Sequence, residues 1–325
     1  MTLADLRAIV DAAASVARDP AIVEPLVKST GLSPEGVRLA LVEHLELDAT
    51  DAELEGVLAA ARTVPRVHVI LSANVFVAPL RALVLARAGA PVVTVRPSRR
   101  EPVFATALVD RLASSHVRLD GPEIESLVEG EIHVYGRDET IADVRHRARV
   151  PVVGHGSGMG IAFVPDGSDL AAAATHLSRD VIAFDQRGCL SPRVAFVEGD
   201  VSTFATLLFE ALEARAETVP RGTLADDEIA DATRYADSII FAGVLHRGTS
   251  SLVGVADALV VPPAGRHVHV VRWDPRMLEP IARFVVTVGA PTLDAAAAIA
   301  PPHARRAILG QMQRPRLDGP VDRRP

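Results

Sequence analysis

The chain has 325 residues, of which 49% are hydrophobic and 23% charged, and its formal net charge is −7. This length and apolar content suffice for one large or two smaller folded domains, and they exclude a disordered protein. The negative charge disfavours a general nucleic-acid surface. Cys189 is the only cysteine, which excludes an internal disulfide framework and is typical of a reducing cytoplasm.

Residues 1–63 predict an N-terminal helical segment. Apolar residues recur there at helical spacing, with breaks near Pro20, Gly31 and Pro34, and Ser33 is a suitable helix cap. The opening 20 residues carry charges among the apolar positions, unlike a signal peptide. Arg or Asp interrupts every apolar run before the roughly 20 residues that cross a bilayer. We therefore expect no membrane segment.

Residues 64–180 predict a dinucleotide-binding lobe, because β-like runs alternate there with helical ones. Such strand-then-helix repeats imply a parallel sheet with crossover helices. The expected strands lie within 66–73, 91–97, 131–136, 151–154 and 160–165. The expected helices lie within 79–89, 101–114, 138–148 and 169–179.

Residues 181–325 predict a second α/β lobe that carries Cys189. The expected strands there lie within 193–199, 258–262, 266–273 and 283–289, and the expected helices within 201–215 and 226–244, with another after Pro291. The tail from Arg314 is rich in Pro and Arg, and we expect it to be loose.

Cys189 lies in a polar segment, residues 184–192, with the sequence FDQRGCLSP. Gly188 and Pro192 predict a turn that presents the thiol, and Arg187 is placed to favour the reactive thiolate. A buried, inert cysteine that acts as a small hydrophobe is the alternative. The spacing alone does not separate the two.

Five segments resemble, in order, the LuxC-type acyl-CoA (fatty acyl) reductases of the aldehyde dehydrogenase superfamily. They are residues 71–83 (LSANVFVAPLRAL), 91–102 (PVVTVRPSRREP), 131–141 (EIHVYGRDETI), 184–192 and 309–320 (LGQMQRPRLDGP). The resemblance implies an aldehyde-dehydrogenase-like α/β fold, with a Rossmann-type dinucleotide-binding lobe, a catalytic lobe and the N-terminal helices.

The resemblance also implies catalytic residues. Cys189 matches the nucleophile, and Asn74 matches the asparagine whose amide, with the Cys189 backbone N–H, stabilises an oxyanion. The alternative for Asn74 is a strand-end residue that satisfies a turn. Ala73 stands where the superfamily has a tryptophan.

The cofactor segment predicts NADPH. Where NAD-preferring relatives have an acidic residue for the ribose hydroxyls, this chain has Arg99, and a guanidinium suits a 2′-phosphate instead. Arg96 is expected near the ribose, Ser98 and Arg99 near the phosphate, and Gly136 against the pyrophosphate. The alternative is a pair of solvent-exposed loop arginines.

The segment GHGSGMG (residues 154–160) lacks the glutamate that activates water in oxidative aldehyde dehydrogenases, so the acyl-enzyme is expected to persist. His155 is either an acid or base in its place or a loop residue with no role. These features predict NADPH-dependent reduction of a fatty acyl-CoA to the aldehyde by a cytoplasmic homo-oligomer that needs no metal and binds no nucleic acid. The alternatives are a degenerate, non-catalytic scaffold protein and a reductase of acyl-carrier-protein or acyl-phosphate substrates.

Overall fold

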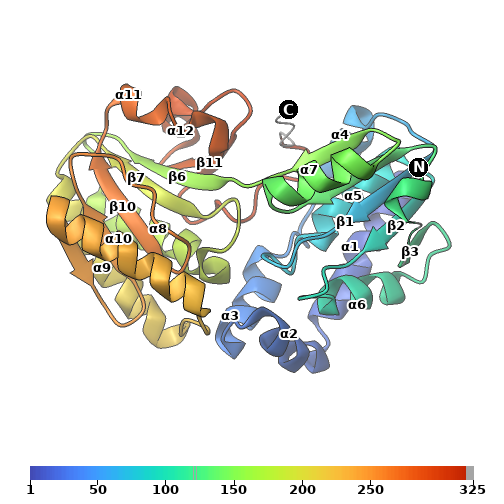
Figure 1. The fold of residues 1–325 in the computed structure, drawn as a ribbon, viewed down its shortest axis with the longest axis horizontal. Coiled ribbons are helices and arrows are strands. Elements are labelled where there is room, and N and C mark those ends of the chain that lie inside the picture. Colours follow the sequence, from blue (N-terminus) through green and yellow to red (C-terminus); the bar gives the residue numbers. More distant parts are fainter. Residues whose placement is uncertain (120, 122, 320–325) are drawn as a thin grey trace. The chain divides into compact units, whose positions relative to one another are not determined.

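A computed structural model describes residues 1–119, 121 and 123–319. The chain divides into two compact units, and each contains one β-sheet with helices on its faces (Figure 1). The first unit comprises Met1–Thr30, Ala40–Ser157 and the C-terminal residues from Arg316. The second comprises Gly31–Leu39 and Gly158–Pro315. The predicted α/β class is confirmed.

The first unit contains a five-stranded, wholly parallel sheet in the order β3-β2-β1-β4-β5. The direction of winding reverses between β1 and β4, and open sheets of this kind bind ligands beyond the carboxyl ends of the strands at that point. The strands are β1 (Arg66–Ile70), β2 (Val92–Arg96), β3 (Val117–Leu119), β4 (Glu131–Tyr135) and β5 (Val152–His155).

Helices cover both faces of this sheet. The α7 helix packs through Ile141 and Val144 on Ile132 and Val134 of β4, and α5 packs on β1 and β2 together with α1, α4 and α6. Because successive side chains of a strand point to opposite faces, Glu131 and His133 face away from α7. The helices are α1 (Leu3–Ala17), α2 (Val23–Thr30), α4 (Asp51–Ala60), α5 (Pro79–Gly89), α6 (Val103–Leu112) and α7 (Asp138–Arg147), with short turns η1 (Pro20–Ile22), η2 (Ala40–His44) and η3 (Ile124–Ser126).

The second unit contains a seven-stranded sheet in the order β12-β11-β6-β7-β10-β9-β8, in which only β8 is antiparallel. The strands are β6 (Met159–Val164), β7 (Pro192–Val197), β8 (Val244–Arg247), β9 (Leu252–Val255), β10 (His267–Arg272), β11 (Val285–Ala290) and β12 (Arg305–Ile308). Valines and isoleucines fill the interior strands, which are buried on both faces.

Two helical layers enclose this sheet. The α8 and α9 helices pack on one face through a cluster that includes Leu177 and Leu208, whereas α11 and α12 cover the other face around Phe163 and Phe196. The α10 helix packs on β8 and β9 at the sheet edge. The helices are α3 (Pro34–Leu39), α8 (Leu170–Ile182), α9 (Val201–Thr218), α10 (Asp226–Ala242), α11 (Pro275–Leu278) and α12 (Leu293–Ile299), with η4 (Ala183–Gln186) and η5 (Ala282–Phe284).

Two sequence predictions fail in detail. Residues 258–262 form no strand, because Pro262 and Pro263 cannot donate to a ladder, and β9 forms earlier in the chain instead. The tail is not loose as far as it is described, since the Leu317 side chain is 1% exposed. Residues 320–325 of the predicted tail lie outside the described residues. Ser33 caps α3 as predicted, accepting a hydrogen bond from Gly36 N.

The predicted segment boundaries at 63/64 and 180/181 do not coincide with the boundaries of the two units. The predicted dinucleotide-binding range of 64–180 covers the whole first sheet, but it also contains β6 and α8. β6 pairs with β7 and β11 inside the second sheet, so strand pairing assigns it to the second unit. In the helical range 1–63, α1 packs on α5 and α6, while α3 belongs to the second unit.

Candidate active site

The segment before Cys189 has an unusual backbone. Phe184, Asp185 and Gln186 have φ values of 55°, 50° and 64°, so three consecutive residues other than glycine are left-handed. Each such residue costs about 1–2 kcal/mol relative to the right-handed conformation. A run of three persists only where its surroundings fix it, and such runs are found at functional sites.

The Gln186 side chain fixes this run from within the second sheet. It is fully buried, donates from Nε2 to the carbonyl oxygens of Pro192 and His267, and accepts from His267 N, each at 2.7 Å. Pro192 begins β7 and His267 begins β10, so the side chain joins the amino ends of two neighbouring strands to the cysteine segment.

Asp185 provides a second anchor through a buried ion pair with Arg266. The two side chains are each 1% exposed, and Arg266 Nε lies 2.8 Å from Asp185 Oδ1. Gly222 N donates to the other carboxylate oxygen at 2.9 Å, and Arg266 also donates to the Val219 carbonyl. Because an unpaired buried charge is strongly destabilising, this pair holds Asp185 in its left-handed conformation.

The residues after Cys189 are held by the C-terminal segment. Gln313 Nε2 donates to Ser191 Oγ at 3.1 Å and to the Asp180 carbonyl at 2.9 Å. The Asp180 carboxylate accepts from the backbone N–H groups of Gly310 and Met312. Burial raises the pKa of Asp180 to about 7, although these donors act to lower it. Residues 309–313, part of the C-terminal segment of the resemblance, thus support the cysteine turn.

Cys189 itself is exposed, which agrees with a presented thiol and contradicts the alternative of a buried, inert cysteine. Arg187, expected to favour the thiolate, forms a two-pronged ion pair with Glu228, with Nε and a terminal nitrogen each 3.0 Å from a carboxylate oxygen. Part of its charge is therefore compensated by Glu228. The turn carries the thiol at the amino edge of the second sheet, before β7.

The predicted cofactor residues lie at the carboxyl edge of the first sheet. Arg96 ends β2, with Ser98 and Arg99 in the loop that follows, and Gly136 directly follows β4. Asn74 follows β1 in an exposed bend. Since all five strands are parallel, their carboxyl ends share one edge, so the sheet brings these residues to the side where such sheets bind ligands.

The arginines at this edge are available to a ligand. The side chains of Arg96 and Arg99 are exposed, and neither forms an ion pair with a carboxylate of the described residues. Ser98 Oγ accepts a hydrogen bond from Arg100 N at 3.2 Å. Glu101, the nearest acid in the sequence, accepts from Val103 N and Phe104 N at the start of α6, and burial raises its pKa.

A methyl group at Gly136 would meet only Thr140, at 3.7 Å, and the residue has no positive φ. Neither packing nor backbone conformation within the described residues therefore requires a glycine there. His155 ends β5, and its ring stacks on Tyr135 with centroids 4.2 Å apart. It lines a cavity of about 410 Å³ with His133 and Glu131, which lie on the face of the sheet opposite α7.

Asn74 belongs to the first unit and Cys189 to the second. Their joint action on one oxyanion stays a prediction.

The sequence did not reveal the anchors Gln186, Asp185 and Arg266. Asp185 and Gln186 had only the signal of a polar run beside the cysteine in an otherwise apolar region, and Arg266, 81 residues from Asp185, lies outside that run.

A family model described as "Acyl-CoA reductase (LuxC)" matches residues 123–302, which is more than half of the chain. The chain belongs to the LuxC acyl-CoA reductase family. It is accordingly an oxidoreductase, with an acyl-CoA reductase or aldehyde dehydrogenase function. Gly136 and Cys189 lie inside the matched segment, whereas Asn74, Arg96 and Arg99 lie before it.

Solved structures of aldehyde dehydrogenases share the fold of this LuxC family member. A NAD-dependent benzaldehyde dehydrogenase from Corynebacterium glutamicum is 16% identical with a TM-score of 0.70, over 92% of this chain and 79% of that one. An NADP-dependent glyceraldehyde-3-phosphate dehydrogenase from Bacillus halodurans C-125, complexed with NADP, is 15% identical with a TM-score of 0.70, over 95% and 77%. An oxidoreductase from Marinobacter aquaeolei is 14% identical with a TM-score of 0.73, over 98% and 82%. No curated protein matches the chain.

Two further observations concern the described residues alone. No group of three or more His, Cys, Asp or Glu side chains among them is arranged to hold a metal ion. None of their helices combines the length and apolar character that crossing a membrane requires.

Proposed function

We propose that this LuxC family member reduces a fatty acyl-CoA to the aldehyde with NADPH, through a thioester on Cys189. The observation that carries the proposal is the exposed thiol on a left-handed turn that Gln186 and the Asp185–Arg266 pair hold in place. A turn with three unfavourable residues and this many buried anchors is more than a surface cysteine requires.

The carboxyl edge of the first sheet suits NADPH. Arg96 and Arg99 would hold the ribose and the 2′-phosphate, with Ser98 Oγ as a further partner of the phosphate. The bare backbone at Gly136 would leave room for the pyrophosphate. When bound, NADPH supplies a hydride to the acyl carbon.

The protein's own residues perform the remaining steps. The Cys189 thiolate attacks the thioester carbonyl, a carbon–sulfur bond forms, and coenzyme A leaves as a thiolate that takes a proton from water. The Asn74 amide and the Cys189 backbone N–H donate to the oxyanion. After reduction the carbon–sulfur bond breaks, which releases the aldehyde and restores the Cys189 thiolate. The sum is acyl-CoA, NADPH and a proton giving aldehyde, coenzyme A and NADP⁺.

The test measures NADPH consumption and aldehyde formation with a panel of fatty acyl-CoAs. We expect turnover by the wild type and none by Cys189→Ala, which should keep the wild-type melting temperature because the side chain is exposed. Asn74→Ala should lower kcat by about 10²–10³. Turnover that survives Cys189→Ala would refute the covalent route. If the wild type neither turns over nor binds NADPH, a non-catalytic role is supported. If it reduces only acyl-carrier-protein or acyl-phosphate substrates, the acyl donor is one of these and not acyl-CoA.

Cofactor preference is tested with Arg99→Glu. The reversed charge should lower the ratio of kcat/KM for NADPH over NADH at least tenfold, because a carboxylate repels the 2′-phosphate and accepts from ribose hydroxyls. Arg118→Glu is the control, since Arg118 is an exposed arginine of β3. If Arg99→Glu leaves the ratio of kcat/KM for NADPH over NADH unchanged, Arg99 does not contact the 2′-phosphate.

A further inference from the structure

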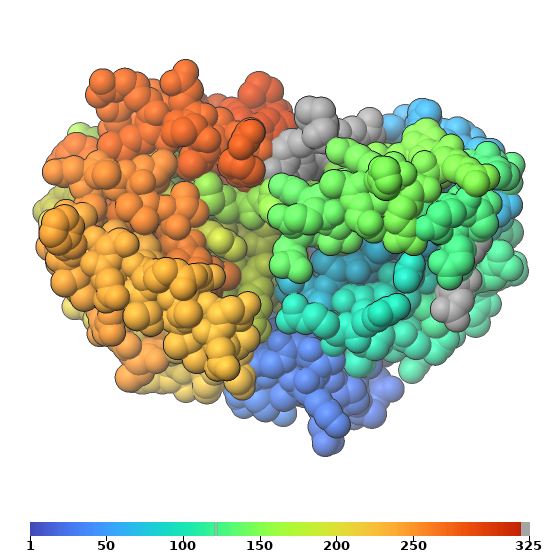
Figure 2. Space-filling model, viewed as in Figure 1, coloured from blue at the N-terminus to red at the C-terminus, as the bar shows by residue number. Residues whose placement is uncertain are grey.

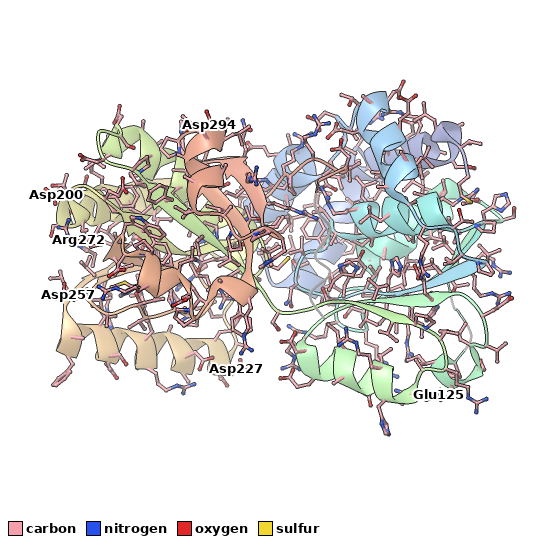
Figure 3. All side chains as sticks on the ribbon, turned by 90° about the horizontal axis from the view of Figure 1, so that it is seen from above. Glu125, Asp200, Asp227, Asp257, Arg272 and Asp294 are labelled. Carbon is pink, nitrogen blue, oxygen red and sulfur yellow. The ribbon has the colours of Figure 1, made fainter. Side chains whose placement is uncertain are left out.

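The second unit contains a cavity of about 550 Å³ at the amino edge of its sheet. One wall is formed by α10, including Ala232 and Ala236. Figure 2 shows this helix in light orange, with its outer face visible. Asp227, labelled in Figure 3, lies in the first turn of this helix and identifies it there. The apolar lining includes Leu224, Ile229 and Leu252. A cavity of this size accommodates an organic ligand.

His267 lies in the lining of this cavity with its ring almost completely buried. The residue is 1% exposed, and neither ring nitrogen has a hydrogen-bond partner among the described residues. An unsatisfied buried polar side chain is costly, and a native structure keeps one where a ligand or water completes its bonding. Burial and the nearby Arg221 charge lower the pKa of His267 to about 4.

The charged lining of the cavity is entirely basic. Arg221 and Arg247 line it, and no described lining residue is Asp or Glu, although the whole chain is acidic. Neither guanidinium forms an ion pair with a described carboxylate. The neighbouring Glu213 is occupied by the hydroxyls of the 249–251 turn. The lining therefore selects an anion that also carries an apolar or aromatic part.

The cavity shares its sheet edge with the cysteine turn. His267 lies opposite Pro192 on the adjacent strand, by extension of the register that pairs His269 with Val194. The Gln186 side chain clamps the His267 backbone from both sides. A ligand that reaches from this cavity towards β7 would thus approach Cys189 along one edge of the second sheet.

We propose that this cavity binds the phosphate-bearing nucleotide of coenzyme A. The inference rests on the proposed function, in which acyl-CoA is the substrate. Arg221, Arg247 and the His267 ring bind the phosphate oxygens, and the α10 wall receives the adenosine. The 3′-phosphate and the 5′-diphosphate supply more negative charge than an acyl group does, which favours this moiety for a basic cavity.

The experiment measures binding to Cys189→Ala, which cannot form the thioester. Adenosine 3′,5′-bisphosphate, the end fragment of coenzyme A, is titrated by calorimetry. Arg247→Met and Arg221→Met should each raise its Kd at least tenfold. Arg247 is the cleaner variant, because Arg221 also donates to the carbonyls of Ser250 and Gly265. Arg234→Met is the matched control, since Arg234 lies exposed on α10 outside the cavity.

Adenosine 2′,5′-bisphosphate, the matching fragment of NADPH, identifies the source of the phosphate. Equal or tighter binding of this fragment, lost in Arg247→Met, would assign the cavity to the cofactor and overturn the proposal. Failure of the 3′,5′ isomer to bind, or binding that Arg247→Met and Arg221→Met leave unchanged, would overturn it as well.

Turnover separates this inference from the proposed function. In enzyme with Cys189 intact, Arg247→Met should raise the KM for acyl-CoA at least tenfold and leave the KM for an acyl-pantetheine, which lacks the nucleotide, unchanged. If the wild type reduces neither thioester but binds adenosine 3′,5′-bisphosphate, the proposed reduction is refuted and the nucleotide site in the cavity is supported. If Arg247→Met raises the KM for acyl-CoA and for acyl-pantetheine equally, the nucleotide site is refuted and the proposed reduction still stands.

Discussion

Replacing Gln186 with leucine should destabilise the second unit and disorder the cysteine turn. The buried amide makes three hydrogen bonds of 2.7 Å, and leucine has nearly the same size but forms none of them. The substitution leaves three backbone groups unsatisfied: the Pro192 carbonyl, the His267 carbonyl and His267 N–H. Each unsatisfied buried group costs about 1–3 kcal/mol. We expect a loss of about 3 kcal/mol or more in the free energy of unfolding.

Trp273 provides the assay, because it is the only tryptophan in the chain and lies in the second unit. Its ring packs on Phe163 and Phe196, with centroids 5.2 Å from each. Urea unfolding followed by its fluorescence therefore reports on the unit that carries Cys189. For a unit of this size, 3 kcal/mol corresponds to a melting temperature lower by about 6–12 °C.

Gln311→Leu is the matched control, since the Gln311 side chain is exposed and its backbone N–H donates to the Ile308 carbonyl in a turn of the same unit. We expect it to change the free energy of unfolding by less than about 0.5 kcal/mol. A Gln186→Leu protein as stable as this control would refute the claim that the amide holds the turn. A destabilised Gln186→Leu protein that reduces acyl-CoA at the wild-type rate would refute the link between the turn and catalysis.

Two further predictions concern the same edge of the second sheet. In Gly160→Ala, the new methyl group would lie 2.3 Å from the Leu190 carbonyl oxygen, so the cysteine turn must shift. We expect urea unfolding to show a free energy of unfolding lower by about 1–3 kcal/mol, and we expect most turnover to be lost. Gly199→Ala is the control and should change neither quantity, because its methyl group would meet only Asp166, at 3.6 Å. The folded-state pKa of His267 lies below its ordinary value, so the unfolded chain binds more protons and stability falls as the pH drops from about 6.5 to about 4. His267→Gln should therefore remove about 2 kcal/mol of the stability difference between pH 7 and pH 5, whereas the exposed His176→Gln should not; equal slopes in both variants would contradict the assignment.

The architecture was predictable because apolar periodicity determines it. Alternating strand and helix patterns between residues 66 and 154 predicted four of the five strands of the first sheet. The strands β3 (Val117–Leu119), β8 (Val244–Arg247), β9 (Leu252–Val255) and β12 (Arg305–Ile308) were missed, because a run of three or four residues is too short to show a clear periodicity. The strand predicted at 258–262 was wrong because the run of valines was given more weight than Pro262 and Pro263, which cannot donate to a ladder.

The candidate site was predictable only where a motif identified it. The motifs indicated Cys189 and the basic loop after β2, and no periodicity identifies a side chain that acts through long-range bonds. Arg266 and Asp185 are 81 residues apart, as are Gln186 and His267. Contacts of this separation arise from the order of β7 and β10 in the sheet, which the order of elements in the sequence does not specify.

The C-terminal segment shows how a sequence signature can serve structure and not chemistry. Gln313 and the backbone of residues 310–312 bond to Ser191 and Asp180 on either side of the cysteine turn. None of these bonds presents a group to a substrate, yet each limits the freedom of the backbone that carries the thiol. The anchors from β10 act on the residues before Cys189, and the C-terminal anchors act on those after it. Positional control from both directions is what a nucleophile on a strained turn requires.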